Sequence, residues 1–359
     1  MGKEKTVKAV LQIDGAALAM TLGIGAVGGW LAHLAHLPLG FLLGSLLSVG
    51  VIAGAGWRPL GRQMTLPARL RFSFVPVIGV AIGGGFTPAV AAEVPGWWPT
   101  LLALSVFVPM AHTVGYAIFR RGGLRPKDAF YGAVPGGLIE SVQMGEEAGA
   151  DMRLLTVLQF LRLILTIVSV PMMFWAMTGQ AVGSASGVEM VGADAVLGVR
   201  GVTMLVLAGV VGVAVGRALR LPGWIITGPV AVSAVMHGMG WVEGVPPGWL
   251  ISVTQVVLGA GLGARFAGVE REMLWRAGRL AAINGVVALA LALVFAEGLH
   301  LLVGEPVPAV FLAFAPGGLA EMSLIALSLH MSAIYVTAHH VARIVLAVSL
   351  AKLGSQWVR

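Results

Sequence analysis

The chain has 359 residues, of which 58% are hydrophobic and only 11% are charged. Soluble domains carry about 25% charged residues, so this chain has too little polar surface for a soluble enzyme or a disordered protein. The composition therefore predicts a polytopic membrane protein. Because cysteine is absent, disulfides and thiolate metal sites are excluded.

The formal net charge of +7 would suggest a nucleic-acid partner in a soluble protein. Here the basic residues lie between apolar runs, which is typical of cytoplasmic loops in membrane proteins. We therefore expect a lipid bilayer as the partner and no nucleic acid.

Apolar runs long enough to cross a bilayer occur along the whole chain, since a span needs about 20 residues. Ten such runs lie near 14–33, 38–56, 74–92, 97–119, 154–177, 200–219, 222–240, 249–267, 280–303 and 333–352. Two further apolar segments, 129–147 and 310–330, are interrupted by Pro-Gly-Gly. The prediction is an all-α fold of about ten transmembrane helices plus two discontinuous or re-entrant segments.

The sequence repeats itself with a shift of about 180 residues. The stretch Pro135-Gly136-Gly137-Leu138-x-Glu140 recurs as Pro316-Gly317-Gly318-Leu319-x-Glu321. Without a gap, Arg162 then matches Arg343. Such matches in one order predict two membrane repeats, residues 1–180 and 181–359.

The charges of the loops predict how the two repeats lie in the membrane. Residues 57–71 are basic and their counterpart 241–248 is not, whereas 265–279 are basic and their counterpart 91–97 is not. The third pair, basic 120–127 and acidic 297–308, follows the same rule. The repeats are therefore expected to be inverted, with both termini cytoplasmic. Each repeat then crosses an odd number of times, either through a re-entrant Pro-Gly-Gly segment or through a broken helix that crosses while another run does not.

The two Pro-Gly-Gly segments are the candidate substrate site. Proline lacks a backbone donor and glycine adopts conformations closed to other residues, so both break a helix. Irregular backbone at membrane depth survives only against protein or a wet cavity, and the positive end of a broken helix favours an anion. The alternative is a plain kink with tight packing. The residues are Pro135, Gly136, Gly137, Pro316, Gly317 and Gly318.

Glu140 and Glu321 are carboxylates inside apolar sequence, where an unpaired charge is costly. They are candidates for carrying H⁺ or Na⁺ in coupled transport. The alternative is a structural ion pair with Arg162 or Arg343.

Arg162 and Arg343 lie in the middle of the runs that follow the breaks. Thr156 and Gln159 share a helix face with Arg162, as Thr337 and His340 do with Arg343. A guanidinium group binds a carboxylate or phosphate through two parallel bonds, so we expect the arginines to hold an anionic solute. Alternatively, each neutralises a glutamate or caps carbonyl groups of the broken helix.

The eight histidines are scattered and form none of the spacings typical of metal ligands. We therefore expect no metal site, no cofactor and no enzyme activity.

With its paired Pro-Gly-Gly-Leu-x-Glu elements, its Leu-Pro-x-Gly from Leu37 to Gly40 and its Gly-Ala-Asp at 149–151, the chain resembles the AbrB family of bacterial membrane proteins. In the second half, Leu221-Pro222-Gly223 shifts the glycine and Ser332 replaces the acidic residue at 151. Family members carry labels such as regulator of gene expression and ammonia monooxygenase. The resemblance implies a bacterial inner-membrane protein similar to inverted-repeat carriers, which by analogy form homodimers through scaffold helices.

The functional hypothesis is a secondary transporter of a small anionic organic solute, coupled to H⁺ or Na⁺, with alternating access around the paired breaks. The alternative is a membrane sensor or regulatory protein that affects gene expression indirectly.

Overall fold

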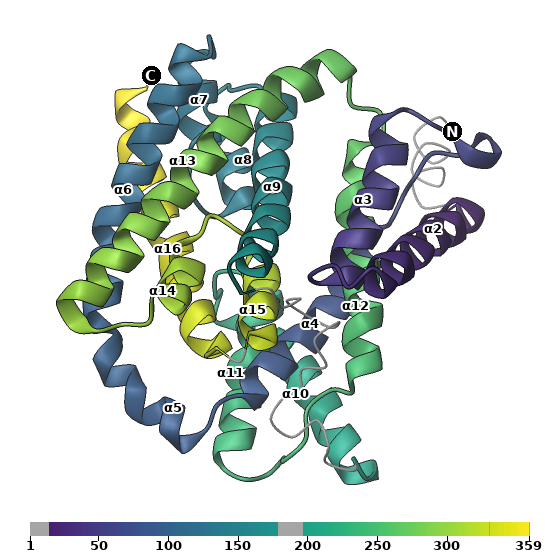
Figure 1. Ribbon diagram of the computed structural model, residues 1–359, viewed down its shortest axis with the longest axis vertical. Coiled ribbons are helices and arrows are strands. Elements are labelled where there is room, and N and C mark those ends of the chain that lie inside the picture. Colours follow the sequence, from purple (N-terminus) through teal and green to yellow (C-terminus); the bar gives the residue numbers. More distant parts are fainter. Residues whose placement is uncertain (1–13, 179–196, 330, 359) are drawn as a thin grey trace.

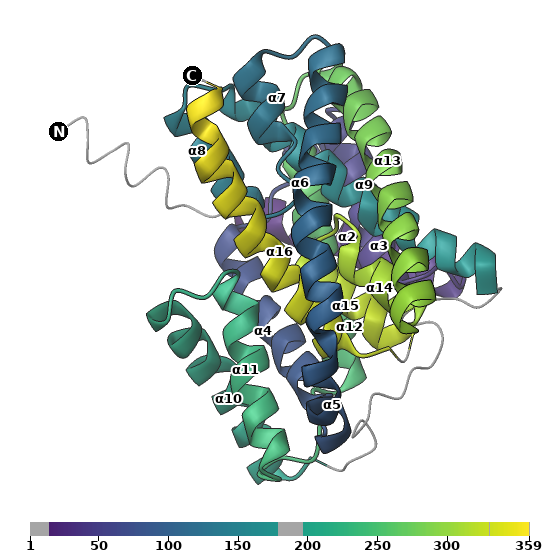
Figure 2. The ribbon, with the colours of Figure 1, turned by 90° about the vertical axis from the view of Figure 1, so that its left-hand side faces the viewer.

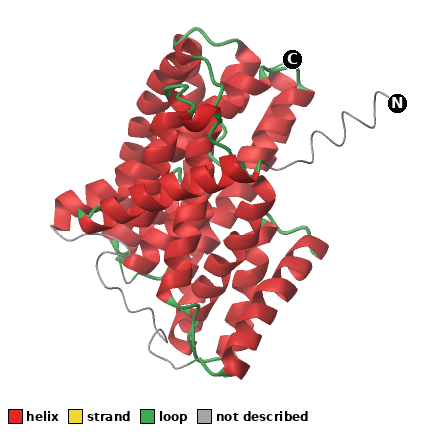
Figure 3. Ribbon diagram, turned by 90° about the vertical axis from the view of Figure 1, so that its right-hand side faces the viewer, coloured by secondary structure: helices red, strands yellow, loops and turns green. Residues whose placement is uncertain are grey.

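The computed structural model describes residues 14–178, 197–329 and 331–358, and these residues form helices and connecting loops without strands (Figure 3). Seven of the described helical segments are long and apolar enough to cross a membrane, and shorter apolar helices accompany them. The protein is therefore a polytopic, all-α membrane protein. The expected repeat boundary at residue 180 and the expected cytoplasmic position of residues 1–13 lie outside the described residues.

The helices form two bundles that lie side by side (Figure 1). Six helices pack mainly against one another and are called the scaffold bundle below. They are α2 (Gly15–Leu34), α3 (Gly40–Gly54), α4 (Ala68–Gly84), α10 (Val199–Ala218), α11 (Trp224–Gly238) and α12 (Gly248–Gly263).

The second group, called the core bundle, contains both interrupted segments (Figure 2). Its long helices are α6 (Trp98–Arg121), α9 (Met152–Thr178), α13 (Arg271–Val303) and α16 (Ala333–Gly354). Its short helices are α7 (Pro126–Gly132), α8 (Leu138–Glu147), α14 (Val307–Phe314) and α15 (Leu319–Ser328). Short helical turns, η2 (Val94–Trp97), η4 (Ala264–Phe266) and η5 (Ser355–Trp357), adjoin α6, α12 and α16.

Glycines allow the scaffold helices to cross with their backbones in contact. A Cβ atom at Gly83 would lie 2.6 Å from the carbonyl oxygen of Val230, and one at Gly263 would lie 2.7 Å from that of Leu46. Helices in lipid gain little hydrophobic energy from association, so close van der Waals packing of this kind stabilises them. The scaffold bundle is held together by such crossings of α4 with α11 and of α12 with α3.

Two of the expected runs have different limits in the structure. The run expected over 74–92 is α4 followed by a separate short helix, α5 (Pro88–Glu93), because Thr87 caps the latter: its Oγ1 accepts the Val90 N–H at 3.3 Å. Helix α13 begins at Arg271 rather than at residue 280. Hydropathy detects the apolar part of a helix, whereas basic residues extend the helix beyond the membrane.

The helix order after residue 199 follows the order before residue 178, and the backbone repeats in detail. Leu39 and Gly223, each directly before its helix, have φ values of 46° and 59°. His36 and Arg220, three residues earlier, have φ values of 56° and 52°. These rare left-handed conformations at matched positions extend the sequence repeat to the local structure.

Candidate functional site

The first interrupted segment is a re-entrant hairpin formed by α7 and α8. Asp128, in the first turn of α7, accepts the backbone N–H of Asp151 at 2.8 Å, and Asp151 immediately precedes α9. The chain therefore returns, after the break, to the level at which it entered. Of the two arrangements left open by the sequence, this is the re-entrant one.

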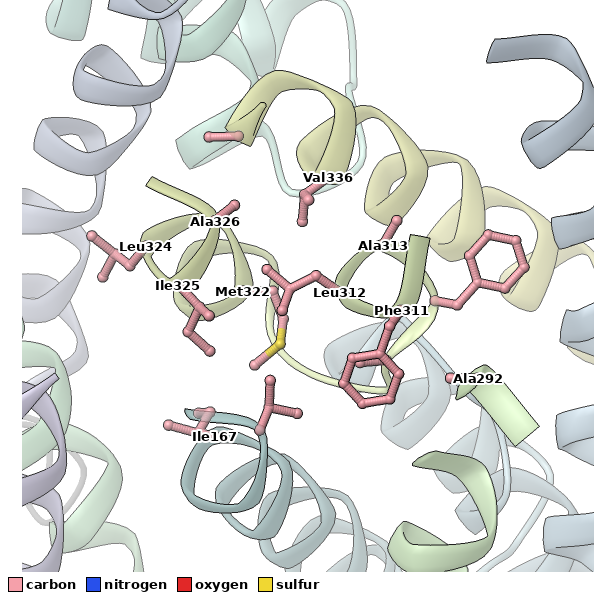
Figure 4. Close-up of a cluster of buried hydrophobic side chains, with 14 of the residues drawn as sticks. Ile167, Ala292, Phe311, Leu312, Ala313, Met322, Leu324, Ile325, Ala326 and Val336 are labelled. Atoms are coloured by element: carbon pink, nitrogen blue, oxygen red, sulfur yellow. The ribbon is translucent and has the colours of Figure 1, made fainter. Parts of the chain in front are cut away.

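The second segment is re-entrant as well. His340 donates to the carbonyl of Leu312, and Arg343 donates to that of Ala315, so residue numbers increase in the same direction along α14 and α16. Since α14 and α16 run parallel and adjacent, α15 between them must bring the chain back. Figure 4 shows the apolar side chains that pack around this hairpin: Leu312, Met322 and Val336 point toward one another, near Ile167 of α9.

In the first repeat, α9 donates hydrogen bonds to the carbonyl groups at the break. Arg162 Nη1 lies 2.5 Å from the carbonyl oxygen of Val134. Gln159 Nε2 lies 3.1 Å from the carbonyl oxygens of both Tyr131 and Gly132. The helix end that Pro-Gly-Gly leaves without backbone partners is thus capped by two side chains one turn apart.

In the second repeat, α16 makes the corresponding bonds. Arg343 donates to the carbonyl groups of Ala315 and Gly317, the latter at 2.8 Å. His340 Nε2 lies 3.0 Å from the carbonyl oxygen of Leu312, and Arg343 Nη2 lies 3.1 Å from His340 Nδ1. Tyr131 and Leu312, and likewise Val134 and Ala315, differ by the same 181 residues as the donors, so the two caps are equivalent.

These hydrogen bonds bear on the roles expected for the arginines, which were binding an anion, neutralising a glutamate or capping carbonyl groups. Both side chains cap broken-helix carbonyls, and both are buried, Arg162 with 7% and Arg343 with 2% of its surface exposed. Within the described ranges the ion pairs are Arg62 with Asp14 and Arg125 with Asp128, so neither arginine has a carboxylate partner there.

Each break also contacts the long helix of the other repeat. A Cβ atom at Gly136 would lie 3.5 Å from Cα of Ile344 on α16, and one at Gly318 would lie 3.0 Å from Cδ1 of Leu163 on α9. Ile344 and Leu163 directly follow the two capping arginines in the sequence. Each break therefore lies against the long helix of the other half, beside the arginine that this helix carries.

The two glutamates fold back toward the N-terminal ends of their own helices. Glu140 Oε2 lies 3.1 Å from the position of a Cβ atom at Gly137, and the carboxylate of Glu321 lies over Gly318 in the same way. A carboxylate there is favourable because the first N–H groups of a helix are unpaired. The ion pair of either glutamate with Arg162 or Arg343 is not formed among the described residues.

The two glutamates differ in their surroundings. Glu321 is buried, with 9% of its surface exposed, whereas Glu140 is partly exposed. Helix α15, which carries Glu321, packs against the scaffold helix α4.

The threonines on the polar faces of α9 and α16 make different contacts. Thr337 is buried, and its hydroxyl lies 2.7 Å from that of Ser323 on α15, so it links the hairpin to α16. Thr156 donates only to the carbonyl of Met152 in its own helix. Thr156 was expected to contribute to the site, whereas Asp128 and Ser323 were not. The spacing of Arg125 and Asp128, three residues apart at a helix start, was the available signal.

Among the described residues, no group of three or more histidines and carboxylates comes together as metal ligands.

The sequence model of a family described as transition state regulatory protein AbrB matches residues 50–359. The chain is 26% identical over 351 residues to the uncharacterized protein YhjN of Bacillus subtilis (strain 168), covering 92% of this chain and 90% of that protein. It is also 26% identical over 315 residues to a protein of Escherichia coli (strain K12) that is named as a regulator, AbrB, covering 86% and 85% of the two chains. With the paired breaks and a family match over most of its length, the chain belongs to the AbrB family.

Proposed function

We propose that the protein is a secondary transporter of a small anionic organic solute, coupled to H⁺ or Na⁺. The observation that carries this proposal is the pair of buried arginines, each of which caps one break that also contacts the long helix of the other half. Both side chains are positively charged, and no carboxylate of the described residues pairs with them.

The energetics favour an anion at this place. Removing a guanidinium group from water costs several kcal/mol unless its charge and its donors are matched. The carbonyl groups accept from part of each guanidinium group, but the Nε–H groups of Arg162 and Arg343 have no hydrogen-bond partner among the described residues. A carboxylate or phosphate of the solute would supply both the missing charge and the missing acceptors.

The breaks and the glutamates supply the remaining parts of the proposed site. The backbone of Pro135 to Gly137 and of Pro316 to Gly318 would line it, and Glu140 and Glu321 lie over the helix ends that favour anions. A cation bound to these carboxylates, either H⁺ or Na⁺, would neutralise them and leave the helix ends to the solute. The binding of the solute and of the cation would then be coupled.

Alternating access is proposed to arise from motion of the core bundle against the scaffold bundle, with residues 1–180 and 181–359 as inverted repeats. Two hydrogen bonds support the inversion, because they join basic segments of both repeats: Arg271 donates to Ala55 at 3.4 Å, and Arg276 to Gly123 at 3.4 Å. That face is proposed to be cytoplasmic in a bacterial inner membrane, and the scaffold helices to pair the protein as a homodimer.

The test is uptake of labelled monocarboxylates, dicarboxylates and phosphorylated acids into proteoliposomes under an imposed pH or Na⁺ gradient. We expect gradient-driven uptake of at least one class. Uptake should be lost in Arg343→Ala and retained in Arg217→Ala, since Arg217 is exposed on α10. The absence of flux for the whole panel, with correctly folded protein, would refute the proposal.

A second candidate is a membrane sensor or regulatory protein without transport, which the names of the matched family and of the Escherichia coli relative favour. Its charged loops would have to bind a cytoplasmic protein. Co-purification of one partner in stoichiometric amount, together with the absence of flux, would favour this function over transport.

A further inference from the structure

The two arginine caps are built alike but differ in one chemical property. In the first repeat the carbonyl one turn before the break is held by Gln159, and in the second the equivalent carbonyl is held by His340. A glutamine amide does not titrate near neutral pH, whereas an imidazole does. The second cap therefore contains a group that can bind a proton and the first does not.

The hydrogen bonds of His340 define its state. The carbonyl oxygen of Leu312 only accepts, so Nε2, at 3.0 Å, carries the hydrogen. A guanidinium group only donates, so Nδ1, 3.1 Å from Arg343 Nη2, presents its lone pair. The ring is neutral, and the lone pair of Nδ1 is held by Arg343.

A proton at Nδ1 would disrupt this contact in two ways. It would replace the only acceptor on the ring by a donor that points at another donor, and it would place a second positive charge beside Arg343. Both side chains are almost fully buried, His340 with 0% of its surface exposed, so water screens this repulsion poorly. Arg343 would then have to withdraw from His340, and with it from the carbonyl groups of Ala315 and Gly317.

In the part of the chain that the structure describes, neither ion pair joins a carboxylate to His340. The ionisable side chains next to His340 on its own helix are Arg343, which donates to Nδ1, and His339. Helix α14, which supplies Leu312, has no ionisable side chain. Among the other helices that pack on α16, Glu321 of α15 lies over Gly318 and Glu140 of α8 lies near Gly137.

Helices α4 and α6 also pack on α16. The ionisable residues of α4 are Arg69 and Arg71, in its first turn, and on α6 the ring of His112 packs against Phe130.

We propose that His340 is a proton-binding positioning residue: a proton at Nδ1 displaces Arg343 from the second break and loosens the hairpin of α14 and α15. The cap of the first hairpin, formed by Gln159 and Arg162, has no titratable imidazole at the position of His340. This inference refines the proposed transport function by making H⁺ a ligand of one break, and it rests on that function only for its role in coupling.

The test measures the opening of each hairpin without any solute. The chain has no cysteine, so single cysteines can be introduced without background. Leu319 and Leu138 occupy equivalent positions, each the first residue after Pro-Gly-Gly, and both are half-buried. The rates at which N-ethylmaleimide modifies Leu319→Cys and Leu138→Cys are compared from pH 8 to pH 5, and their ratio cancels the common pH dependence of the thiol.

We expect the ratio of Leu319→Cys to Leu138→Cys to rise on acidification, by up to about tenfold per pH unit, because one proton shifts the population of the open hairpin. His340→Gln, which copies the cap of the first repeat, should make the ratio independent of pH. Gln159→His should confer pH dependence on Leu138→Cys.

An unchanged slope in His340→Gln would overturn the inference, as would a flat ratio in the unmodified background. Size-exclusion chromatography and thermal denaturation in detergent establish that both variants fold. Since the labelling requires no transport, its failure is distinct from an absence of flux, which would refute the proposed function alone.

Discussion

At the scale of single residues, Arg162 and Arg343 serve a need that Pro-Gly-Gly creates. The bilayer offers no hydrogen bonds, so carbonyl groups freed at a break require a donor from the protein. A buried guanidinium with several N–H groups reaches two carbonyl groups at once, as Arg343 does with Ala315 and Gly317. The same groups hold the positive charge on which the proposed anion site depends.

The loss of Arg343 should therefore affect stability as well as solute binding. We expect Arg343→Ala to lower the free energy of unfolding by about 2–4 kcal/mol, because hydrogen bonds to charged groups contribute about 1.5–3 kcal/mol each. Arg343→Lys keeps the charge but cannot span two carbonyl groups, so it should fall between the alanine variant and the unmodified protein. Thermal denaturation in detergent measures the order, and an Arg343→Ala variant as stable as the unmodified protein would contradict it.

Gly137 is required for the conformation of the first break. Its φ of 63° is left-handed, and a Cβ atom there would lie 3.0 Å from Cγ2 of Val348. We expect Gly137→Ala to destabilise the protein by about 1–2 kcal/mol. Gly136→Ala is the matched control, since Gly136 is not left-handed and its Cβ atom would make ordinary contacts at 3.5 Å. Equal melting temperatures for the two variants would show that the backbone angle is unimportant.

At the scale of elements, the re-entrant hairpins are the features that distinguish this fold from a plain bundle. Each short helix would be unstable alone, since isolated helices of fewer than about 12 residues are marginal even in favourable sequences. Tertiary contacts therefore hold them: α7 and α8 against α6 and α9, and α14 and α15 against α13 and α16. Asp151 caps the N-terminus of α9 through its Oδ1, and Ser332 caps that of α16 through its hydroxyl. The second half therefore keeps the helix cap although serine replaces aspartate there.

Asp128 closes the base of the first hairpin. Its side chain is buried, with 2% of the residue exposed, and it accepts from Arg125 and from the Asp151 N–H. We expect Asp128→Ala to cost about 1.5–3 kcal/mol of stability and to make trypsin cleave faster at Arg153, beside the hairpin base. Asp128→Asn retains an oxygen for the Asp151 N–H and should remain near the stability of the unmodified protein. If trypsin cleaves all three proteins alike, the hairpin base does not depend on this contact.

At the scale of the whole molecule, the basic segments gather at one end, where the C-terminal end of α16 and helix α7 also lie (Figure 1). A protein in the membrane exposes this end to one compartment. The proposed inversion of the repeats thus predicts which loops lie on the same side of the membrane.

Single-cysteine labelling with a membrane-impermeant maleimide tests this statement. Arg58→Cys and Glu272→Cys should react from the same side of the membrane, in inside-out vesicles, because their segments are joined by the bond from Arg271 to Ala55. Glu243→Cys should react only in intact cells or right-side-out vesicles. Labelling of Arg58→Cys and Glu272→Cys from opposite sides would exclude inverted repeats.

The proposed motion between the bundles can be tested by a cross-link. The guanidinium of Arg265, in the scaffold, lies 4.9 Å from the ring centre of Phe160 on α9. A cross-link between Phe160→Cys and Arg265→Cys should abolish gradient-driven uptake, and reduction should restore it. A cross-link between Trp97→Cys and Tyr335→Cys, both in the core bundle, should leave uptake unchanged. Transport that continues with the first pair linked would show that the bundles need not move.

Much of this architecture could be predicted from the sequence, because its signals are local or periodic. The apolar runs predicted an all-α membrane protein, and the Pro-Gly-Gly elements predicted where helices stop. The helical spacing of Gln159 with Arg162, and of His340 with Arg343, predicted that each pair lies on one face. The limits of α13 were wrong by nine residues, because a helix continues past the apolar stretch that hydropathy detects.

The tertiary structure alone decided what those faces touch. Whether the interrupted segments cross or return depends on a contact between Asp128 and the backbone of Asp151, 23 residues apart, and a pattern along the chain does not encode it. In the same way, the sequence determined that Arg162 and Arg343 lie in the middle of apolar runs, but only packing decided that they bond to carbonyl groups and not to Glu140 or Glu321. Composition and periodicity specify which side chains leave water, whereas partners are set by the distances between helices that come together only when the chain is folded.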